Sequence, residues 1–261
     1  MVTFIICVKH YENCYSYNDT WNLLEKTLVS VCGQLDKRFK VIVVSNKTLN
    51  TFSENTKIKN VKFIEVKWPP PSSPNSWQIG TQVSHEDGMN QIRLDRGTKY
   101  ILALSEVDDD NYVMFVDADD FIHRDLVRAI NNSNKDFLRI SKGIRMGVDN
   151  SFEYINDFDK KCGTCNITKA NILKENINFK KVNLTSSQNT IIKSTQKFYL
   201  MRVIGSHAFC WRYFKHKGYE GENINFKAAI YNCSHNEQHS GKSNLKYSQK
   251  MSKSMKMHFN I

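Results

Sequence analysis

Apolar runs alternate with amphipathic stretches along the first half of the chain. The runs at 3–8, 39–44 and 61–66 have the length and the β-branched content of buried strands. Between and after them, residues 20–32 and 88–104 have apolar side chains at helical spacing. We therefore predict strand–helix–strand units joined by right-handed crossovers.

A further apolar run, 112–116, leads directly into the acidic residues Asp117, Asp119 and Asp120. Such a run predicts a strand buried on both faces, and ligands bind at the carboxyl ends of strands in open α/β sheets. Asp117 and Asp119 are two residues apart, so on an extended backbone they point to the same side. Two carboxylates placed in this way suit Mg²⁺ or Mn²⁺ that also carries phosphates. In the alternative interpretation, an acid only caps a helix that begins near Phe121.

The second half of the chain has a less regular pattern. Residues 121–131 and 208–217 have the spacing of helices, and 138–144 and 224–231 have that of strands. Residues 145–200 are polar, rich in Asn and Lys, and predict no clear elements. Taken together, the elements indicate an α/β fold.

Charge and cysteine usage narrow the class of protein. The chain has 261 residues, a net charge of +11 and a pI near 9.2, which favours partners such as phosphates, anionic lipids or nucleic acid. Its seven scattered cysteines are typical of reduced thiols and not of a disulfide framework. The chain starts directly with an apolar strand and has no run as long as a membrane span, so we expect a cytoplasmic protein.

The order of these elements and the acidic motif resemble the glycosyltransferase family 2 type of GT-A enzyme, over about residues 3–241. Residues 112–126 are similar to the family's strand, Asp-x-Asp motif and following helix, and residues 5–10 are similar to the strand and turn that hold the nucleobase. The acid that the family usually has after its second strand is replaced by Ser45 and Asn46. The resemblance is thus strongest at the acidic motif and weakest at the nucleobase contact.

The resemblance implies a single GT-A domain, an α/β fold with a mixed, mostly parallel sheet and helices on both faces. Residues 1–120 would form the nucleotide-sugar-binding half and residues 121–241 the acceptor-binding half, followed by a basic tail at 242–261. The implied activity is metal-dependent, inverting transfer of a sugar to a hydroxyl of a glycan or of a lipid-linked acceptor. A uridine diphosphate sugar is the first choice of donor.

The resemblance also implies three groups of site residues. The nucleotide-sugar would contact Cys7, Val8, Lys9, Arg96, Lys99 and Asp117. The ligands for Mn²⁺ or Mg²⁺ would be Asp117, Asp119 and either His235 or His239. The catalytic base would be His207. Glu220 and Glu222 are alternative bases. We expect Arg96 and Lys99 on polar faces of the helix at 88–104, where they would assist the diphosphate.

Three other interpretations remain open at this point. Cys162-x-x-Cys165 with His235-x-x-x-His239 offers four zinc ligands, although the two pairs are far apart in the chain. Phosphatases of the haloacid dehalogenase type also have Asp-x-Asp after an apolar strand, but near the start of the chain. A basic nucleic-acid-binding domain would fit the charge, but the chain has no recognisable motif of such a domain. Within the transferase interpretation, a nucleic acid is the less common kind of acceptor. The basic tail would permit peripheral contact with the inner face of a membrane.

Overall fold

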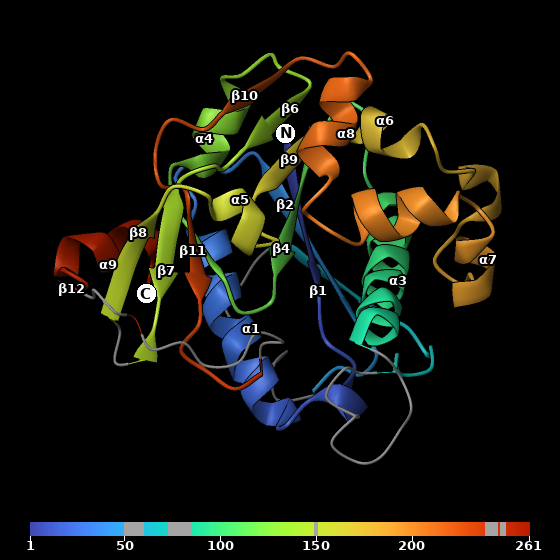
Figure 1. The fold of residues 1–261 in the computed structure, drawn as a ribbon, viewed down its shortest axis with the longest axis horizontal. Coiled ribbons are helices and arrows are strands. Elements are labelled where there is room, and N and C mark those ends of the chain that lie inside the picture. The colour runs from blue at the N-terminus through green and yellow to red at the C-terminus, as the bar shows by residue number, and fades with distance from the viewer. Residues whose placement is uncertain (50–59, 73–84, 149–150, 238–244, 246–248) are drawn as a thin grey trace.

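The computed structural model describes residues 1–49, 60–72, 85–148, 151–237, 245 and 249–261. Its main feature is a central sheet of seven strands. In spatial order the strands are β10 (Gly221–Asn223), β6 (Phe137–Arg139), β9 (Asn166–Lys169), β4 (Tyr112–Asp117), β1 (Val2–Cys7), β2 (Phe39–Ser45) and β3 (Val61–Glu65) (Figure 1). The neighbours from β4 to β3 are parallel, β9 runs antiparallel to both β4 and β6, and β10 is parallel to β6. The predicted α/β class with a mixed, mostly parallel sheet is confirmed.

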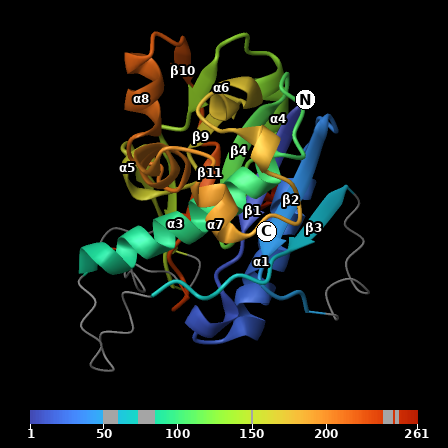
Figure 2. The same cartoon turned by 90° about the vertical axis from the view of Figure 1, so that its right-hand side faces the viewer.

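Helices cover both faces of this sheet, because alternate side chains of its strands point to opposite sides. On β1, Phe4 and Ile6 pack with α1 (Tyr17–Cys32) and the short α4 (Leu126–Asn131). Ile5 packs on the opposite face, toward α3 (His85–Leu104), the π-helix η5 (Tyr199–Ile204) and α8 (Cys210–His216). In Figure 2, α3 lies in front of the central strands. The continuous apolar runs of the sequence correspond to this burial on two sides.

Two glycines allow α3 and η5 to pack closely. A Cβ on Gly97 would lie 2.6 Å from the Leu200 carbonyl oxygen, and one on Gly205 would lie 2.1 Å from the Arg93 carbonyl oxygen. Backbone atoms cannot yield to such contacts, so any side chain at either position would separate the two helices. Beside this pair lie α6 (Ala170–Lys174), η4 (Phe179–Lys181) and α7 (Gln188–Ile192), from the region whose pattern predicted no elements.

A second sheet of five strands stands beside the first one. Its order is β12 (Gln249–Lys250), β8 (Ser151–Ile155), β7 (Gly143–Met146), β11 (Ala229–Asn232) and β5 (Phe121–Ile122). Figure 1 shows β7, β8 and the last helix, α9 (Lys253–Phe259), together at one side of the central sheet. The described part of the basic tail is therefore folded: β12 pairs with β8, and the Phe259 side chain is buried.

Three predicted elements differ from the observed ones. The strand predicted at 224–231 begins only at Ala229, and two other elements are divided by pairing with distant strands. The first two residues of the helix predicted at 121–131 form β5, which pairs with β11, and α4 begins only at Leu126. The strand predicted at 138–144 is divided between β6 and β7, which belong to different sheets. In both cases pairing with a distant strand overrides the local pattern. Within the described residues, no helix combines the length and the apolar character needed to cross a membrane.

Candidate active site

The carboxyl ends of β1 and β4 define the candidate site. From β1 the chain passes through α1 to β2 on one side, whereas β4 pairs with β1 on the other side, so the connections diverge between β1 and β4. Such a switch point leaves a crevice at the strand ends. Here the crevice is a cavity of about 260 Å³. The register pairs Cys7 with Asp117, which brings the loop after β1 level with the acidic motif.

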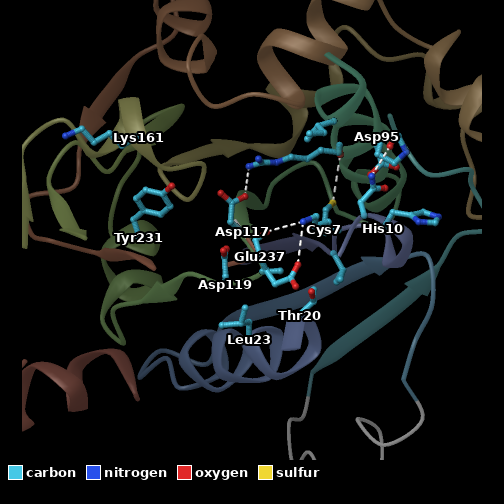
Figure 3. A pocket seen from close by; sticks show the side chains of 17 residues that line it. Cys7, His10, Thr20, Leu23, Asp95, Asp117, Asp119, Lys161, Tyr231 and Glu237 are labelled. Carbon is cyan, nitrogen blue, oxygen red and sulfur yellow. Dashed lines mark hydrogen bonds and ion pairs between the residues drawn. The ribbon is translucent and has the colours of Figure 1, made fainter. Parts of the chain in front are cut away.

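Residues from distant parts of the chain line this cavity. They include Cys7, Val8, Lys9, His10, Asn13, Asp95, Arg96, Asp117, Asp119, Lys161, Tyr231 and Glu237. Figure 3 shows Asp117 and Asp119 between Lys161 and Tyr231 on one side and Cys7 and His10 on the other. Of the residues predicted to contact a nucleotide-sugar, all except Lys99 line the cavity.

Arg96 and Asp117 form an ion pair at the centre of the site. The Nη2 atom of Arg96 lies 2.5 Å from Oδ1 of Asp117, and its Nε donates a hydrogen bond of 3.2 Å to the Tyr100 hydroxyl. Burial alone would lower the pKa of Arg96, but the charge of Asp117 raises it above its ordinary value. About a quarter of each side chain is exposed, 27% and 26% respectively, so both charges remain accessible from the cavity.

Asp120 fixes the acidic motif to neighbouring segments through hydrogen bonds. Its carboxylate accepts hydrogen bonds from the Thr164 hydroxyl, from the Cys162 thiol (3.0 Å) and from the Asn232 backbone N–H (3.1 Å). The Thr164 oxygen in turn accepts the Asp117 N–H at 2.9 Å. Burial raises the pKa of Asp120, and the nearby charges of Asp119 and Asp117 add to the effect. Asp120 is fully buried and joins β4 to the 162–164 turn and to β11, so its position is structural.

Asp119 meets His235 from the segment after β11. The Nε2 atom of His235 lies 3.0 Å from Oδ2 of Asp119, and its Nδ1 accepts the Glu237 N–H. Glu237 then joins this segment to the N-terminal loop, because its carboxylate accepts the backbone N–H groups of Tyr15 and Ser16. The predicted partner of Asp119 is thus adjacent to it. The alternative, His239, lies outside the described residues.

Two lysines, Lys9 and Lys99, fix the loop after β1. The ammonium of Lys9 lies 3.5 Å from the Glu237 carboxylate and donates to the Glu237 carbonyl oxygen. The ammonium of Lys99 lies 2.8 Å from Asp95 and donates to the Val8 carbonyl oxygen at 3.1 Å. Lys99 is completely buried, so the prediction of a polar, diphosphate-facing position is wrong for this residue. Asp95, its neighbour by one helical turn, is also buried and neutralises its charge.

His207 lies outside the cavity lining but within the electrostatic influence of its ion pair. Burial lowers the pKa of His207, and the charge of Arg96 lowers it further, whereas Asp117 opposes the shift. Its ring is therefore neutral at neutral pH, as a base requires. The alternative bases are distant: Glu220 pairs with Lys135, and Glu222 accepts from Ser133 at the edge strand β10.

The two residues that replace the expected acid after β2 have structural contacts. The Asn46 amide donates to the carbonyl oxygens of Val66 and Trp68, and the Ser45 hydroxyl lies 3.5 Å from that of Thr48. Neither residue lines the cavity. A nucleobase would have to be held by other groups.

Several cavity residues had no predicted role, and among them are Asn13, Lys161, Tyr231 and Glu237. Tyr231 is the last residue of the predicted strand 224–231, and Glu237 lies between the two candidate histidines, so the pattern placed both near the site without assigning them a role. Asn13 and Lys161 had no local signal. The Asn13 amide donates to the Pro71 carbonyl oxygen, a contact that only the tertiary structure creates.

The zinc interpretation finds no support in the described residues. Groups of at least three metal-ligating side chains with close donor atoms occur there twice, as Asp117, Asp120 and Cys162 and as His123, Asp125 and His258. Cys165 and His235 belong to neither group. The Cys165 thiol instead points to the Asp159 carbonyl oxygen at 3.9 Å.

No protein-family model matches the chain, and no curated protein matches it. Glycosyltransferases are among the solved structures that resemble it. TarS 1–349 of S. aureus has a TM-score of 0.47 at 12% identity, over 89% of this chain and 60% of that chain. The galactosyltransferase LgtC in complex with donor and acceptor sugar analogs has a TM-score of 0.41 at 11% identity, over 90% of this chain and 88% of that one.

A cytidylyltransferase from Francisella tularensis also matches, with a TM-score of 0.36 at 13% identity, over 99% of this chain and 97% of that one. This chain spans less than two thirds of the TarS chain. All three TM-scores are below 0.5, and the three proteins differ in what their names describe. The case for an activity therefore rests on the side chains of the site.

Proposed function

We propose that the protein is a glycosyltransferase that moves a sugar from a nucleotide-sugar, first of all a uridine diphosphate sugar, to a hydroxyl of a glycan or of a lipid-linked acceptor. One observation carries the proposal: Asp119, which His235 contacts from outside the lining, and the Arg96–Asp117 pair line one cavity at the switch point between β1 and β4. This combination of cationic and anionic groups supports the proposal, because a diphosphate and a divalent cation need groups of both kinds when they bind together.

The donor set at Asp119 suits a divalent cation. Two ligand atoms bound at about 2.1 Å and at right angles are about 3.0 Å apart. The Oδ2 atom of Asp119 and Nε2 of His235 have this separation, 3.0 Å. A carboxylate oxygen of Asp117 would complete a site for Mn²⁺ or Mg²⁺ if Asp117 turned from Arg96 toward this pair, because its donor atoms are grouped instead with Asp120 and Cys162. Such an ion supplies positive charge that stabilises the departing nucleoside diphosphate.

The chain's own residues would bind and orient the donor. Arg96 presents a guanidinium to the cavity, and the charge of this group suits the oxygens of a diphosphate. Cys7, Val8 and Lys9 would line the nucleobase end of the cavity. Lys99 acts indirectly, because its hydrogen bond to the Val8 carbonyl oxygen fixes the loop after β1.

For the acceptor step His207 is the proposed base, because its pKa is lowered and the two charges that act on it, Arg96 and Asp117, line the cavity. The acceptor hydroxyl oxygen attacks the anomeric carbon, the bond from this carbon to the phosphate oxygen breaks, and the hydroxyl proton passes to the His207 imidazole. The nucleoside diphosphate leaves with the bonding electrons. Direct displacement of this kind inverts the anomeric centre. Lys161 and Tyr231, which line the side of the cavity nearest Asp117 in Figure 3, would contact the sugar or the acceptor.

Calorimetric titration of uridine diphosphate, with and without Mn²⁺, tests the proposal on the wild type, on Asp119→Asn and on Asp110→Asn. Asp110 is exposed and precedes the same strand outside the cavity, so its variant is a matched control. We expect binding that requires Mn²⁺ in the wild type and the control and that is lost in Asp119→Asn. Binding that ignores both the metal and the substitution would contradict the proposed site.

A further inference from the structure

A second cluster of metal-ligating side chains lies away from the cavity, where the C-terminal helix docks. It consists of His123 and Asp125, which follow β5, and His258 on α9. The donor atoms of all three lie within 4.8 Å of one another. None of them lines the cavity at β1 and β4. Each of the three side chains is partly buried, at an interface that backbone hydrogen bonds hold together.

The two imidazole rings are arranged as a pair. They are nearly parallel, at 14°, and their centroids are 4.9 Å apart. The backbone around them is fixed, because the Arg124 N–H donates to the His258 carbonyl oxygen at 2.8 Å. Phe259 packs edge-on against the His123 ring, so the orientation of that ring is also constrained. Two neighbouring imidazoles can supply two of the ligands of a zinc site.

The distance between the carboxylate of Asp125 and the ring of His123 suits two ligands of one metal ion better than a hydrogen bond. The Oδ2 atom of Asp125 lies 3.7 Å from Nδ1 of His123, which is longer than a hydrogen bond. Two atoms bound to one zinc ion at about 2.0–2.1 Å in tetrahedral geometry are about 3.4 Å apart. The other oxygen of Asp125 pairs with Arg128, which leaves Oδ2 toward the histidines. The Nδ1 atom of His123 accepts the Asp125 N–H at 3.2 Å, so an ion bound at this nitrogen would replace that hydrogen bond.

His258 supplies an independent observation. Its Nδ1 atom is buried and has no hydrogen-bond partner in the structure, although a buried polar atom of this kind normally has one. A metal ion bound at this nitrogen would give it the partner that it lacks.

We propose that His123, Asp125 and His258 bind one zinc ion, with water as a fourth ligand, and that this ion fastens α9 to the turn after β5. Two imidazoles and a carboxylate are ligands that zinc accepts in tetrahedral sites. The ion would join the end of the chain to residues that directly follow the acidic motif. This site is independent of the proposed sugar transfer, and it would remain if the cavity proved to have another activity.

The experiment uses the Asp119→Asn protein, which lacks a ligand of the proposed Mn²⁺ or Mg²⁺ site. It measures the zinc bound per chain after dialysis and the rise in melting temperature when Zn²⁺ is added. We expect one zinc per chain and a raised melting temperature. Adding His258→Gln, or separately Asp125→Asn, should abolish the bound zinc and the shift, whereas His216→Gln, at the exposed end of α8, should change neither.

Cobalt tests the geometry of the site. With Co²⁺ in place of zinc, the visible absorption of a tetrahedral site should appear in the Asp119→Asn protein and in the same protein with His216→Gln. It should be absent when His258→Gln or Asp125→Asn is added. If His258→Gln does not fold, Asp125→Asn decides the question, since that residue lies on the surface turn and its loss leaves α9 intact. The proposal is overturned if the Asp119→Asn protein binds no zinc, or if folded His258→Gln or Asp125→Asn retains a full equivalent.

Discussion

Arg96 on α3 and Asp117 at the end of β4 form an ion pair of 2.5 Å whose charged atoms lie against Gly163. A Cβ at position 163 would be 2.3 Å from Nη2 of Arg96 and 2.5 Å from Oδ2 of Asp117. The pair and a side chain at 163 cannot occupy the same space. A glycine in the turn after α5 (Phe158–Lys161) is thus part of the architecture of the candidate site.

Gly163→Ala should therefore impair the site more than the fold. We expect uridine diphosphate with Mn²⁺ to bind at least about tenfold more weakly, equivalent to about 1.4 kcal/mol, because the methyl group displaces Arg96 and Asp117. Calorimetry measures the affinity, and urea unfolding measures the stability of the same sample. Wild-type affinity in Gly163→Ala would show that the ion pair is not needed for binding.

Thr164→Val should destabilise the protein by roughly 1–3 kcal/mol. The hydroxyl both accepts the Asp117 N–H and donates to Asp120, so its removal leaves a buried N–H unpaired and takes one donor from a buried carboxylate. Thr164→Ser retains the hydroxyl and is the matched control. Equal losses in Val and Ser variants would mean that the methyl group, and not the hydrogen bonds, supports this turn.

Lys99→Met should cost roughly 3–5 kcal/mol of unfolding free energy, because it leaves the Asp95 carboxylate buried without its cation. Adding Asp95→Asn should recover much of this loss, since no buried charge remains. The surface pair of Lys62 with Glu106 provides the control: Lys62→Met should cost no more than about 1 kcal/mol. Urea unfolding of the four proteins distinguishes these cases. Similar losses for Lys99→Met and Lys62→Met would contradict the structural role of Lys99.

The pattern of the sequence predicted the parallel strands β1 to β4. The runs in β1 and β4 are nearly all apolar, as expected when both faces of a strand are covered, whereas β2 contains Lys40 and β3 contains Lys62 and Glu65. It also predicted the acidic motif at a strand end, since that position follows directly from the end of the run at Val116. Lys99 shows the limit of the method: a Lys and an Asp one helical turn apart have the same pattern whether they face water or neutralise each other inside.

Other features depend on contacts between distant segments and leave no local signal. Gly163 is necessary because of Arg96, which is 67 positions earlier in the chain. Glu237 binds the N–H groups of Tyr15 and Ser16 across 222 and 221 positions. The small elements between 145 and 200 are stabilised by contacts with other segments: β9 pairs with β4, α7 packs on α3, and β8 pairs with β7 and β12. Their own polar pattern therefore did not predict them.

His10 makes the stability of the protein sensitive to acid. It is buried beside the cavity, its ring stacks on Tyr11 with centroids 4.4 Å apart, and its Nδ1 accepts the Glu12 N–H. Burial lowers the pKa of His10 below its ordinary value, and the charge of Lys99 lowers it further. The folded protein therefore holds this ring neutral at pH values where the unfolded chain already binds a proton.

The sign of the effect follows from this difference in bound protons. Above the ordinary histidine pKa of about 6.5, neither state protonates His10 and its contribution is complete. As the pH falls from there toward the lowered pKa of the folded state, the unfolded chain gains a proton first, so stability is lost. We expect His10→Gln, in the absence of nucleotide, to lose less unfolding free energy than the wild type between pH 7.5 and pH 5.0. His216→Gln, which removes an exposed histidine, should retain the wild-type dependence, and an unchanged dependence in His10→Gln would refute this origin of the acid sensitivity.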